Sequence, residues 1–128
     1  MNVFLSIVVA AVAVFVVSSA WYVVFAAPRA AMLGTAPSAD RPPVRNVVLE
    51  LLRSALVASV IAGLAAHLAI SSVAPALLLG LVLFAGFPFV LLTGSVLWDK
   101  VNWQLAAIHG GDWLLKLLVI SLIIGLFR

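Results

Sequence analysis

The chain has 128 residues, of which 66% are hydrophobic and 9% are charged, and its mean hydropathy is +1.35. A soluble domain carries about 25% charged residues, so this composition excludes a soluble globular protein and indicates a protein of the lipid bilayer. The formal net charge of +3 comes from scattered basic residues, which argues against nucleic acid binding, and the absence of cysteine excludes disulfides and thiol chemistry.

Four apolar stretches each approach the roughly 20 residues that cross a bilayer core as a helix. We therefore predict an all-α, polytopic membrane protein whose four transmembrane helices form an up-down bundle. The whole chain, 1–128, is expected to be a single transmembrane domain. The helices are expected at about residues 3–26, 46–70, 76–98 and 104–127.

The first apolar stretch is interpreted as a helix that stays in the membrane, because no basic segment precedes it and it is too long for the apolar part of a signal peptide. It is followed by the one long loop, residues 27–45, which is expected to be mobile around 35–39 and holds Gly34, Pro37, Pro42 and Pro43. Asn46 is the expected N-cap of the second helix.

The last two apolar stretches each contain a possible irregularity. Pro88 lies near the middle of the third and predicts a kink, because proline removes a backbone donor. The fourth helix begins somewhere between Trp103 and Gly111. Residues 103–111 therefore either belong to the membrane-spanning helix or lie along the membrane interface.

Basic residues predict the orientation of the chain in the cell membrane. They concentrate in the two loops on one side, 27–45 and 99–103, whereas the other side carries only Arg128 and the amino terminus. By the positive-inside rule both loops are cytoplasmic and both termini are extracytoplasmic.

Five polar residues inside the second and fourth helices are the strongest candidates for a functional site. His109, Asp112 and Lys116 are spaced i, i+3, i+7 and share one helical face. An unpaired charge at mid-membrane costs at least about 2.5–3.5 kcal/mol, so these residues are expected to find partners. The second helix supplies them with Glu50 and Arg53.

We expect Arg53 to contact Asp112 between the second and fourth helices, because the two lie at a similar depth. Glu50 and Lys116 would then complete a neutral cluster, which Trp98 and Trp113 are expected to line. Two interpretations remain open. A dry, fully paired cluster would orient the helices, whereas a cluster that faces a water-filled cavity would favour transport or binding.

Small residues predict where the helices pack closely. Two rows of small residues recur every fourth residue in the second helix, a spacing that lets transmembrane backbones approach each other: Ala55, Ser59 and Gly63, and Ala58, Ala62 and Ala66. These rows make the second helix the expected centre of the bundle. Gly110 and Gly111 allow a similar approach in the fourth helix, or break it there.

A family resemblance is carried by Trp21-Tyr22 at the end of the first helix and by two later segments. These segments are Trp98-Asp99-Lys100-Val101-Asn102-Trp103-Gln104 and Ile108-His109-Gly110-Gly111-Asp112-Trp113-Leu114-Leu115-Lys116. They resemble the DUF1761 family of small bacterial membrane proteins over the whole chain. His109-Gly110-Gly111 stands where that family often has Asn-Ala-Gly. The resemblance implies a fold and a membrane location, and the function of that family is unknown.

The sequence predicts a small integral membrane protein of unknown activity, with a structural or accessory role or as a self-associating bundle. The alternative is a small transporter or channel for a proton-coupled or ionic solute that uses the charged cluster. We expect no enzymatic activity and no cofactor. We also expect no metal site, because His67 and His109 fall in opposite leaflets. The expected partners are the lipid bilayer and a second copy or other membrane proteins.

Overall fold

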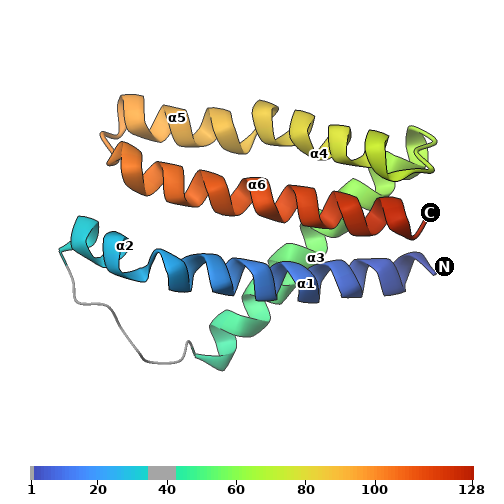
Figure 1. Cartoon of the computed structure of the whole chain (residues 1–128), viewed down its shortest axis with the longest axis horizontal. Coiled ribbons are helices and arrows are strands. Elements are labelled where there is room, and N and C mark those ends of the chain that lie inside the picture. The colour runs from blue at the N-terminus through green and yellow to red at the C-terminus, as the bar shows by residue number, and fades with distance from the viewer. Residues whose placement is uncertain (1, 35–42) are drawn as a thin grey trace.

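The computed structural model describes residues 2–34 and 43–128. Within these ranges the chain is helical, and no strand occurs in them, which confirms the all-α prediction. Six helices follow one another in these ranges (Figure 1): α1 Val3–Val24, α2 Ala26–Leu33, α3 Val44–His67, α4 Val73–Gly86, α5 Pro88–Trp98 and α6 Trp103–Leu126.

Four segments are long and apolar enough to cross a membrane: α1, α3, the α4–α5 pair over Val73–Trp98, and α6. The α4–α5 segment is interrupted at Phe87, directly before Pro88, at the predicted position of the kink. Proline has no N–H to donate to the preceding turn. The helix therefore stops at Gly86 and a new one starts with Pro88 at its first position.

The predicted loop 27–45 is partly helical, which corrects the sequence interpretation. α2 continues the chain after a short break at Phe25 and ends at Leu33, where the C-cap residue Gly34 has a left-handed backbone with a φ of 69°. The α1–α2 break is small because the Phe25 N–H still donates to the Trp21 carbonyl. The rest of the loop, residues 35–42, lies outside the described residues.

The start of α3 also differs from the prediction. The helix begins at Val44 and its N-cap is Pro43, so the assignment of Asn46 as the N-cap was wrong. The carbonyl of Pro43 already accepts hydrogen bonds from the N–H groups of Asn46 and Val47. α6 in contrast starts with a side-chain cap, since the Asn102 side chain accepts from the Gln104 N–H.

α6 runs without a break from Trp103 to Leu126, so Gly110 and Gly111 do not interrupt it and residues 103–111 are no separate interfacial helix. α6 is also the centre of the molecule: it packs against α1, α3, α4 and α5. Figure 1 shows α6 between α1 and the α4–α5 pair, with α3 crossing obliquely behind. The prediction that the second span, α3, is central was therefore wrong.

Of the two small-residue rows predicted on α3, the row of Ala55, Ser59 and Gly63 does not make close contacts. Ser59 and Gly63 are exposed, and a Cβ added to Gly63 would meet nothing within 4 Å. Ala55 is half-buried. The second predicted row lies partly in the core, since Ala58 and Ala62 are buried and Ala66 is exposed. The buried face of α3 consists of Ser54, Ala58, Ile61, Ala62 and Ala65.

The close approach of backbones occurs instead between α4 and α6. A Cβ on Gly80 would lie 2.5 Å from Ser121 Oγ, and one on Gly125 would lie 2.9 Å from the Cβ of Ala76. Such glycines let two transmembrane helices pack at short range. The sequence analysis did not single out Gly80, although Ala76 stands four residues before it and the pair has the small-residue spacing of close helix packing.

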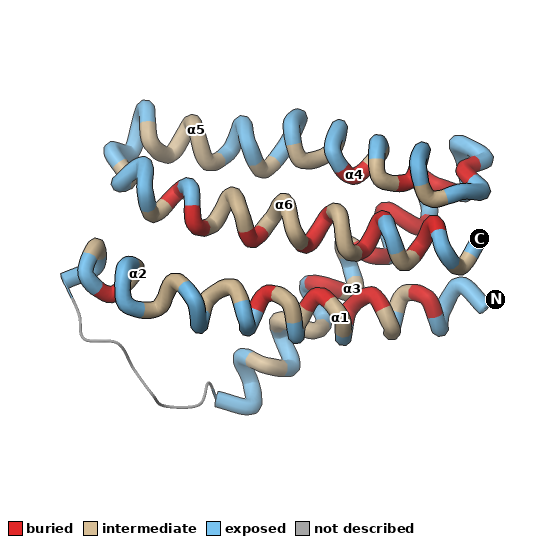
Figure 2. Tube along the Cα trace, viewed as in Figure 1, coloured by how far each residue is buried: buried red, intermediate tan, exposed pale blue. Residues whose placement is uncertain are grey.

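Burial is uneven along the molecule. The apolar core is formed by α1, α3, α4 and α6 and includes the fully buried Val14, Ile61, Ile120 and Ile124. Figure 2 shows these buried segments concentrated in the half that carries both termini, whereas the half near α2 is mostly half-buried or exposed. The helices are thus packed tightly at one end and loosely at the other.

Candidate functional site

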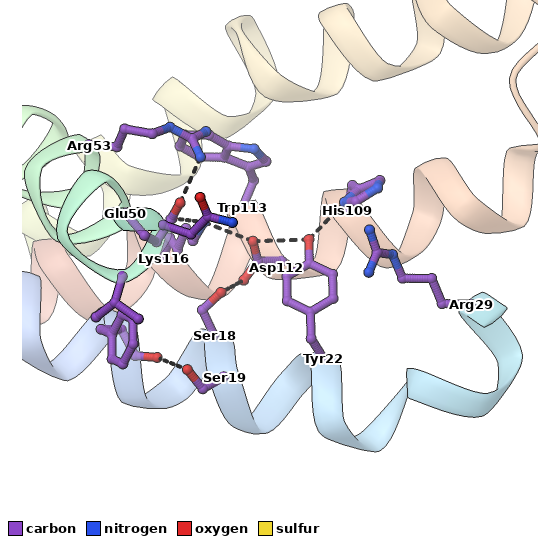
Figure 3. Close-up of a pocket in the computed structure, with 13 residues that line it drawn as sticks. Ser18, Ser19, Tyr22, Arg29, Glu50, Arg53, His109, Asp112, Trp113 and Lys116 are labelled. Atoms are coloured by element: carbon purple, nitrogen blue, oxygen red, sulfur yellow. Dashed lines mark hydrogen bonds and ion pairs between the residues drawn. The ribbon is translucent and has the colours of Figure 1, made fainter. Parts of the chain in front are cut away.

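Charged side chains of α3 and α6 form a continuous chain of ion pairs in the loosely packed half. Lys116 Nζ lies 2.9 Å from Asp112 Oδ2, one turn away on α6, and 3.1 Å from Glu50 Oε1 on α3. The other oxygen of Glu50 lies 2.6 Å from Arg53 Nη1. Figure 3 shows the four groups in this order, with positive and negative charges alternating.

The predicted contact between Arg53 and Asp112 does not form. Arg53 pairs with Glu50, one turn back on its own helix, and its side chain is 64% exposed. Because α3 is oblique to α6, it is Glu50, not Arg53, that reaches α6, and it does so through Lys116. The structure therefore brings together Glu50, Arg53, Asp112 and Lys116, with different partners from those predicted.

Asp112 is the most deeply buried charged group of the site. Its residue is 1% exposed, and that of Lys116 is 8% exposed. Two side chains of α1 complete the surroundings of the carboxylate: the Ser18 hydroxyl donates to Oδ1 at 2.5 Å, and the Tyr22 hydroxyl donates to Oδ2 at 3.4 Å. A buried carboxylate is stabilised when hydrogen bonds and a cation replace its hydration.

Sequence reasoning missed both Ser18 and Tyr22. The available signal was their spacing of four, which places them on one face of α1. That face points at α6, where the buried carboxylate lies. A serine and a tyrosine near the end of an apolar helix nevertheless look like ordinary interfacial residues. Their four-residue spacing indicates a site only once α1 and α6 are known to be neighbours.

His109 joins the same network through Tyr22. Its Nδ1 lies 2.7 Å from the Tyr22 hydroxyl, which also points toward Asp112. When Nδ1 carries the imidazole proton, the ring donates to the tyrosine oxygen and the tyrosine donates to Asp112. One continuous path of hydrogen bonds then leads from His109 to the carboxylate.

Of the two tryptophan residues predicted to line the site, only Trp113 does so. Trp98 is 84% exposed at the end of α5 and does not line the site, because that end of α5 faces outward. Trp113 does line it, and Lys116 Nζ lies 5.0 Å from the centre of the Trp113 ring. Trp21 was not expected near α6, yet its Nε1–H donates to the Ile108 carbonyl at 2.9 Å.

Gly111 makes room for the Trp21 ring, because a Cβ added there would overlap it. Gly110 is less restricted, since its added Cβ would only touch the Leu92 side chain at 3.5 Å. Of the two predicted glycines, Gly111 therefore sets the distance between α1 and α6 beside the site.

A cavity of about 470 Å³ adjoins the network. It lies between α1, α3 and α6, where α3 diverges from the other two, and α2 closes one side. Cavities of this size hold small ligands in other proteins. Its wall consists of Phe15, Ser18, Ser19, Tyr22, Arg29, Asn46, Val47, Glu50, Arg53, His109, Asp112, Trp113 and Lys116.

Arg29 is a cavity residue that the sequence interpretation used only to orient the loops. α2 places its guanidinium carbon 5.4 Å from the centre of the Tyr22 ring. Figure 3 shows the guanidinium beside His109, at the end of the network away from Arg53. The Nε atom of Arg29 is buried and has no hydrogen-bond partner within the described part of the chain.

Metal-ligating side chains are not clustered in the described part of the chain. Among the described residues, no group of three or more histidine, aspartate or glutamate side chains is placed to hold a metal. His109 and His67 are at different ends of the molecule, in the first half of α6 and at the end of α3.

Comparison with known proteins gives one match. A family model described as a protein of unknown function (DUF1761) matches residues 5–125, nearly the whole chain. No curated protein and no solved structure matches the chain. The matched range includes α2 to α5 entirely, all but the first two residues of α1 and all but the last residue of α6. With its four membrane-length apolar segments, the chain belongs to the DUF1761 family, whose function is unknown.

Proposed function

We propose that this protein is a multi-pass protein of the cell membrane that binds a small polar or ionic solute in the cavity between α1, α3 and α6. Its four spans form an up-down bundle, with both termini extracytoplasmic. The single observation that carries the proposal is that the charged network is not sealed: it forms the wall of a 470 Å³ cavity. We propose binding or passage of the solute, without a catalytic step.

The distribution of charge supports a cytoplasmic opening. Arg29, Arg45 and Lys100 belong to the end of the molecule where the cavity lies, whereas Arg128 belongs to the other end. Cytoplasmic loops of membrane proteins carry an excess of basic residues. The cavity then faces the cytoplasm, and the tightly packed half of the bundle separates it from the outside.

The network suits such a cavity because its two carboxylates are fixed by neighbours from three helices. Asp112 is held by Ser18 and Lys116, and Glu50 by Lys116 and Arg53. Ionisable groups inside transmembrane segments are costly and commonly mark solute pathways. Here they provide polar walls whose geometry is set before a solute enters.

A second candidate function is a structural or accessory bundle that associates with a second copy or with other membrane proteins. It is favoured by the burial of Asp112 and Lys116, whose charges compensate each other. In this account the network only orients α1, α3 and α6. The two candidates differ in whether water and small solutes reach the cavity.

Labelling of single cysteines distinguishes them, because the parent chain contains no cysteine. Ser19 lines the cavity, while its neighbour Ala20 is also exposed but does not line it. We expect a membrane-impermeant thiol reagent, applied from the cytoplasmic side of reconstituted vesicles, to modify Ser19→Cys and to leave Ala20→Cys unmodified.

The pair is closely matched, since Ala20 is one residue nearer than Ser19 to the end of α1. Depth alone would therefore make Ala20→Cys the more reactive of the two. Equal protection of both positions, in protein that elutes as a folded species, would refute the open cavity and leave the structural role.

A further inference from the structure

The negative charges of the two cavity carboxylates are already balanced by basic side chains of the protein. Glu50 offers one oxygen to Arg53 and the other to Lys116. Asp112 offers Oδ1 to Ser18, and Oδ2 to Lys116 and Tyr22. Each of the four oxygens already accepts a hydrogen bond or an ion pair, and the two negative charges are balanced by Lys116 and Arg53, so a cationic solute would meet no uncompensated carboxylate.

The basic groups of the cavity wall outnumber its carboxylates, so their positive charge is not fully balanced. Arg29, Arg53 and Lys116 face two carboxylates, which leaves the wall with a net charge of +1 when His109 is neutral. Lys116 and Arg53 take part in the ion pairs, whereas Arg29 takes part in none within the described part of the chain. The excess positive charge therefore resides at Arg29.

The Arg29 side chain has a hydrogen-bond donor, its Nε–H, for which the described residues provide no acceptor. The guanidinium lies over the Tyr22 ring, which contributes π-electron density but no hydrogen-bond acceptor in line with the Nε–H. The buried Nε–H has no partner among the described residues, and a buried donor without a partner costs free energy. An oxyanion that enters the cavity would supply the missing acceptor and the missing negative charge together.

The backbone holds Arg29 in this position. Its N–H donates to the Phe25 carbonyl at 3.0 Å, and the Trp21 and Phe25 rings pack with their centres 4.6 Å apart at the α1–α2 break. Ala30, the next residue, is buried and anchors α2 to the rest of the molecule. The guanidinium is thus presented to the cavity by an ordered helix.

On the basis of the proposed function, we infer that the solute is an oxyanion, a small carboxylate or a phosphate group, and that Arg29 is the residue that binds it. Guanidinium groups bind carboxylate and phosphate oxygens through pairs of parallel hydrogen bonds. The phosphate can belong to a soluble molecule or to the headgroup of a lipid. The shared chemistry is an oxyanion bound beside Tyr22 and His109 within the cavity.

The test measures binding by the purified full-length protein in a maltoside detergent, which contains no phosphate. Inorganic phosphate, acetate and a short-chain anionic phospholipid are titrated separately at constant ionic strength, with chloride as the reference anion and choline as a cationic probe. Thermal unfolding reports binding, since a ligand at 100 times its Kd raises the folding equilibrium constant about 100-fold. Tryptophan fluorescence provides a second readout, because Trp113 lines the cavity.

We expect a saturable rise in Tm with at least one oxyanion and none with choline. Arg29→Gln should weaken this binding about tenfold or more, since it removes a charge-assisted hydrogen-bond donor. Arg29→Lys, which keeps the charge, should bind with intermediate affinity. Arg45→Gln is the matched control, because Arg45 is exposed near the same end of the molecule and does not line the cavity.

The outcomes separate the inference from the proposed function. A response to phosphate or acetate identifies a soluble oxyanion, and a response to the phospholipid alone identifies a lipid headgroup; both support the inference. Saturable binding of choline, an equal loss in the Arg45 and Arg29 variants, or no response to any oxyanion overturns it. If Ser19→Cys is still labelled in the last case, the water-filled cavity stands and only the oxyanion is refuted.

Discussion

The Ser18 hydroxyl on α1 donates a hydrogen bond to Asp112 on α6 across 2.5 Å, although the two residues are 94 positions apart in the chain. This bond joins the first and last spans at the point where the cavity begins. Asp112 also holds Lys116, and Lys116 in turn holds Glu50 of α3. One buried carboxylate thus connects all three helices that line the cavity.

Replacing Asp112 by Asn should strongly destabilise the protein. The change leaves Lys116, whose residue is 8% exposed, with Glu50 as its only ion-pair partner within the described residues. Removal of one member of a buried pair costs about 3–5 kcal/mol, and we expect the lower end of this range because Glu50 remains. The free energy of unfolding in mixed detergent micelles measures the effect.

Asp99→Asn is the control for this experiment, because Asp99 is an exposed carboxylate at the end of α5. It should unfold at nearly the same denaturant concentration as the parent. If Asp112→Asn is as stable as Asp99→Asn, the buried ion pair does not exist as described.

Replacing Arg53 by Gln should have little effect on stability. Arg53 pairs only with Glu50 among the described residues, and its side chain is 64% exposed. Exposed pairs of this kind contribute about 0–1 kcal/mol. In the same unfolding measurement, Arg53→Gln should therefore lose far less free energy of unfolding than Asp112→Asn. A loss as large as that of the Asp112 variant would instead support a direct Arg53–Asp112 contact, as the sequence suggested.

Replacing Gly125 by Ala should destabilise the contact between α4 and α6. The added methyl group would lie 2.9 Å from the Cβ of Ala76 and 3.1 Å from the Cα of Val73, so the two helices must move apart. Overpacking of this kind costs typically about 1–3 kcal/mol. A lower thermal stability of the purified protein is the expected result.

Gly63→Ala provides the contrast, since its methyl group would meet nothing within 4 Å. Alanine is the better helix former by about 1 kcal/mol in water, so this variant should be as stable as the parent or more stable. Should both variants behave alike, Gly125 would not be a point of close approach between α4 and α6.

The sequence predicted the all-helical architecture because length and apolarity determine which segments can cross a bilayer. It also identified Glu50, Arg53, His109, Asp112 and Lys116, since charged and polar residues stand out in an apolar helix. Their pairing was not predictable from depth alone. Counting residues along the helices placed Arg53 and Asp112 at similar depths, but in the folded chain Glu50, not Arg53, pairs with Lys116.

The side chains that α1 and α2 contribute to the cavity could not be predicted from the sequence, for a related reason. Ser18 and Tyr22 become significant only because α1 lies beside α6. No local signal in either helix specifies that neighbour. Arg29 was assigned to a loop, and only the helical α2 carries it back to the cavity wall. Helix identity is encoded locally, whereas helix neighbours depend on packing across the whole chain.

The most direct test of a water-filled, positively charged cavity is the rate at which Ser19→Cys reacts with two small thiol reagents of equal size and opposite charge. We predict faster modification by the anionic reagent, and a ratio of rates that falls when Arg29 is also replaced by Gln. Faster reaction with the cationic reagent, or no reaction with either, would contradict the account.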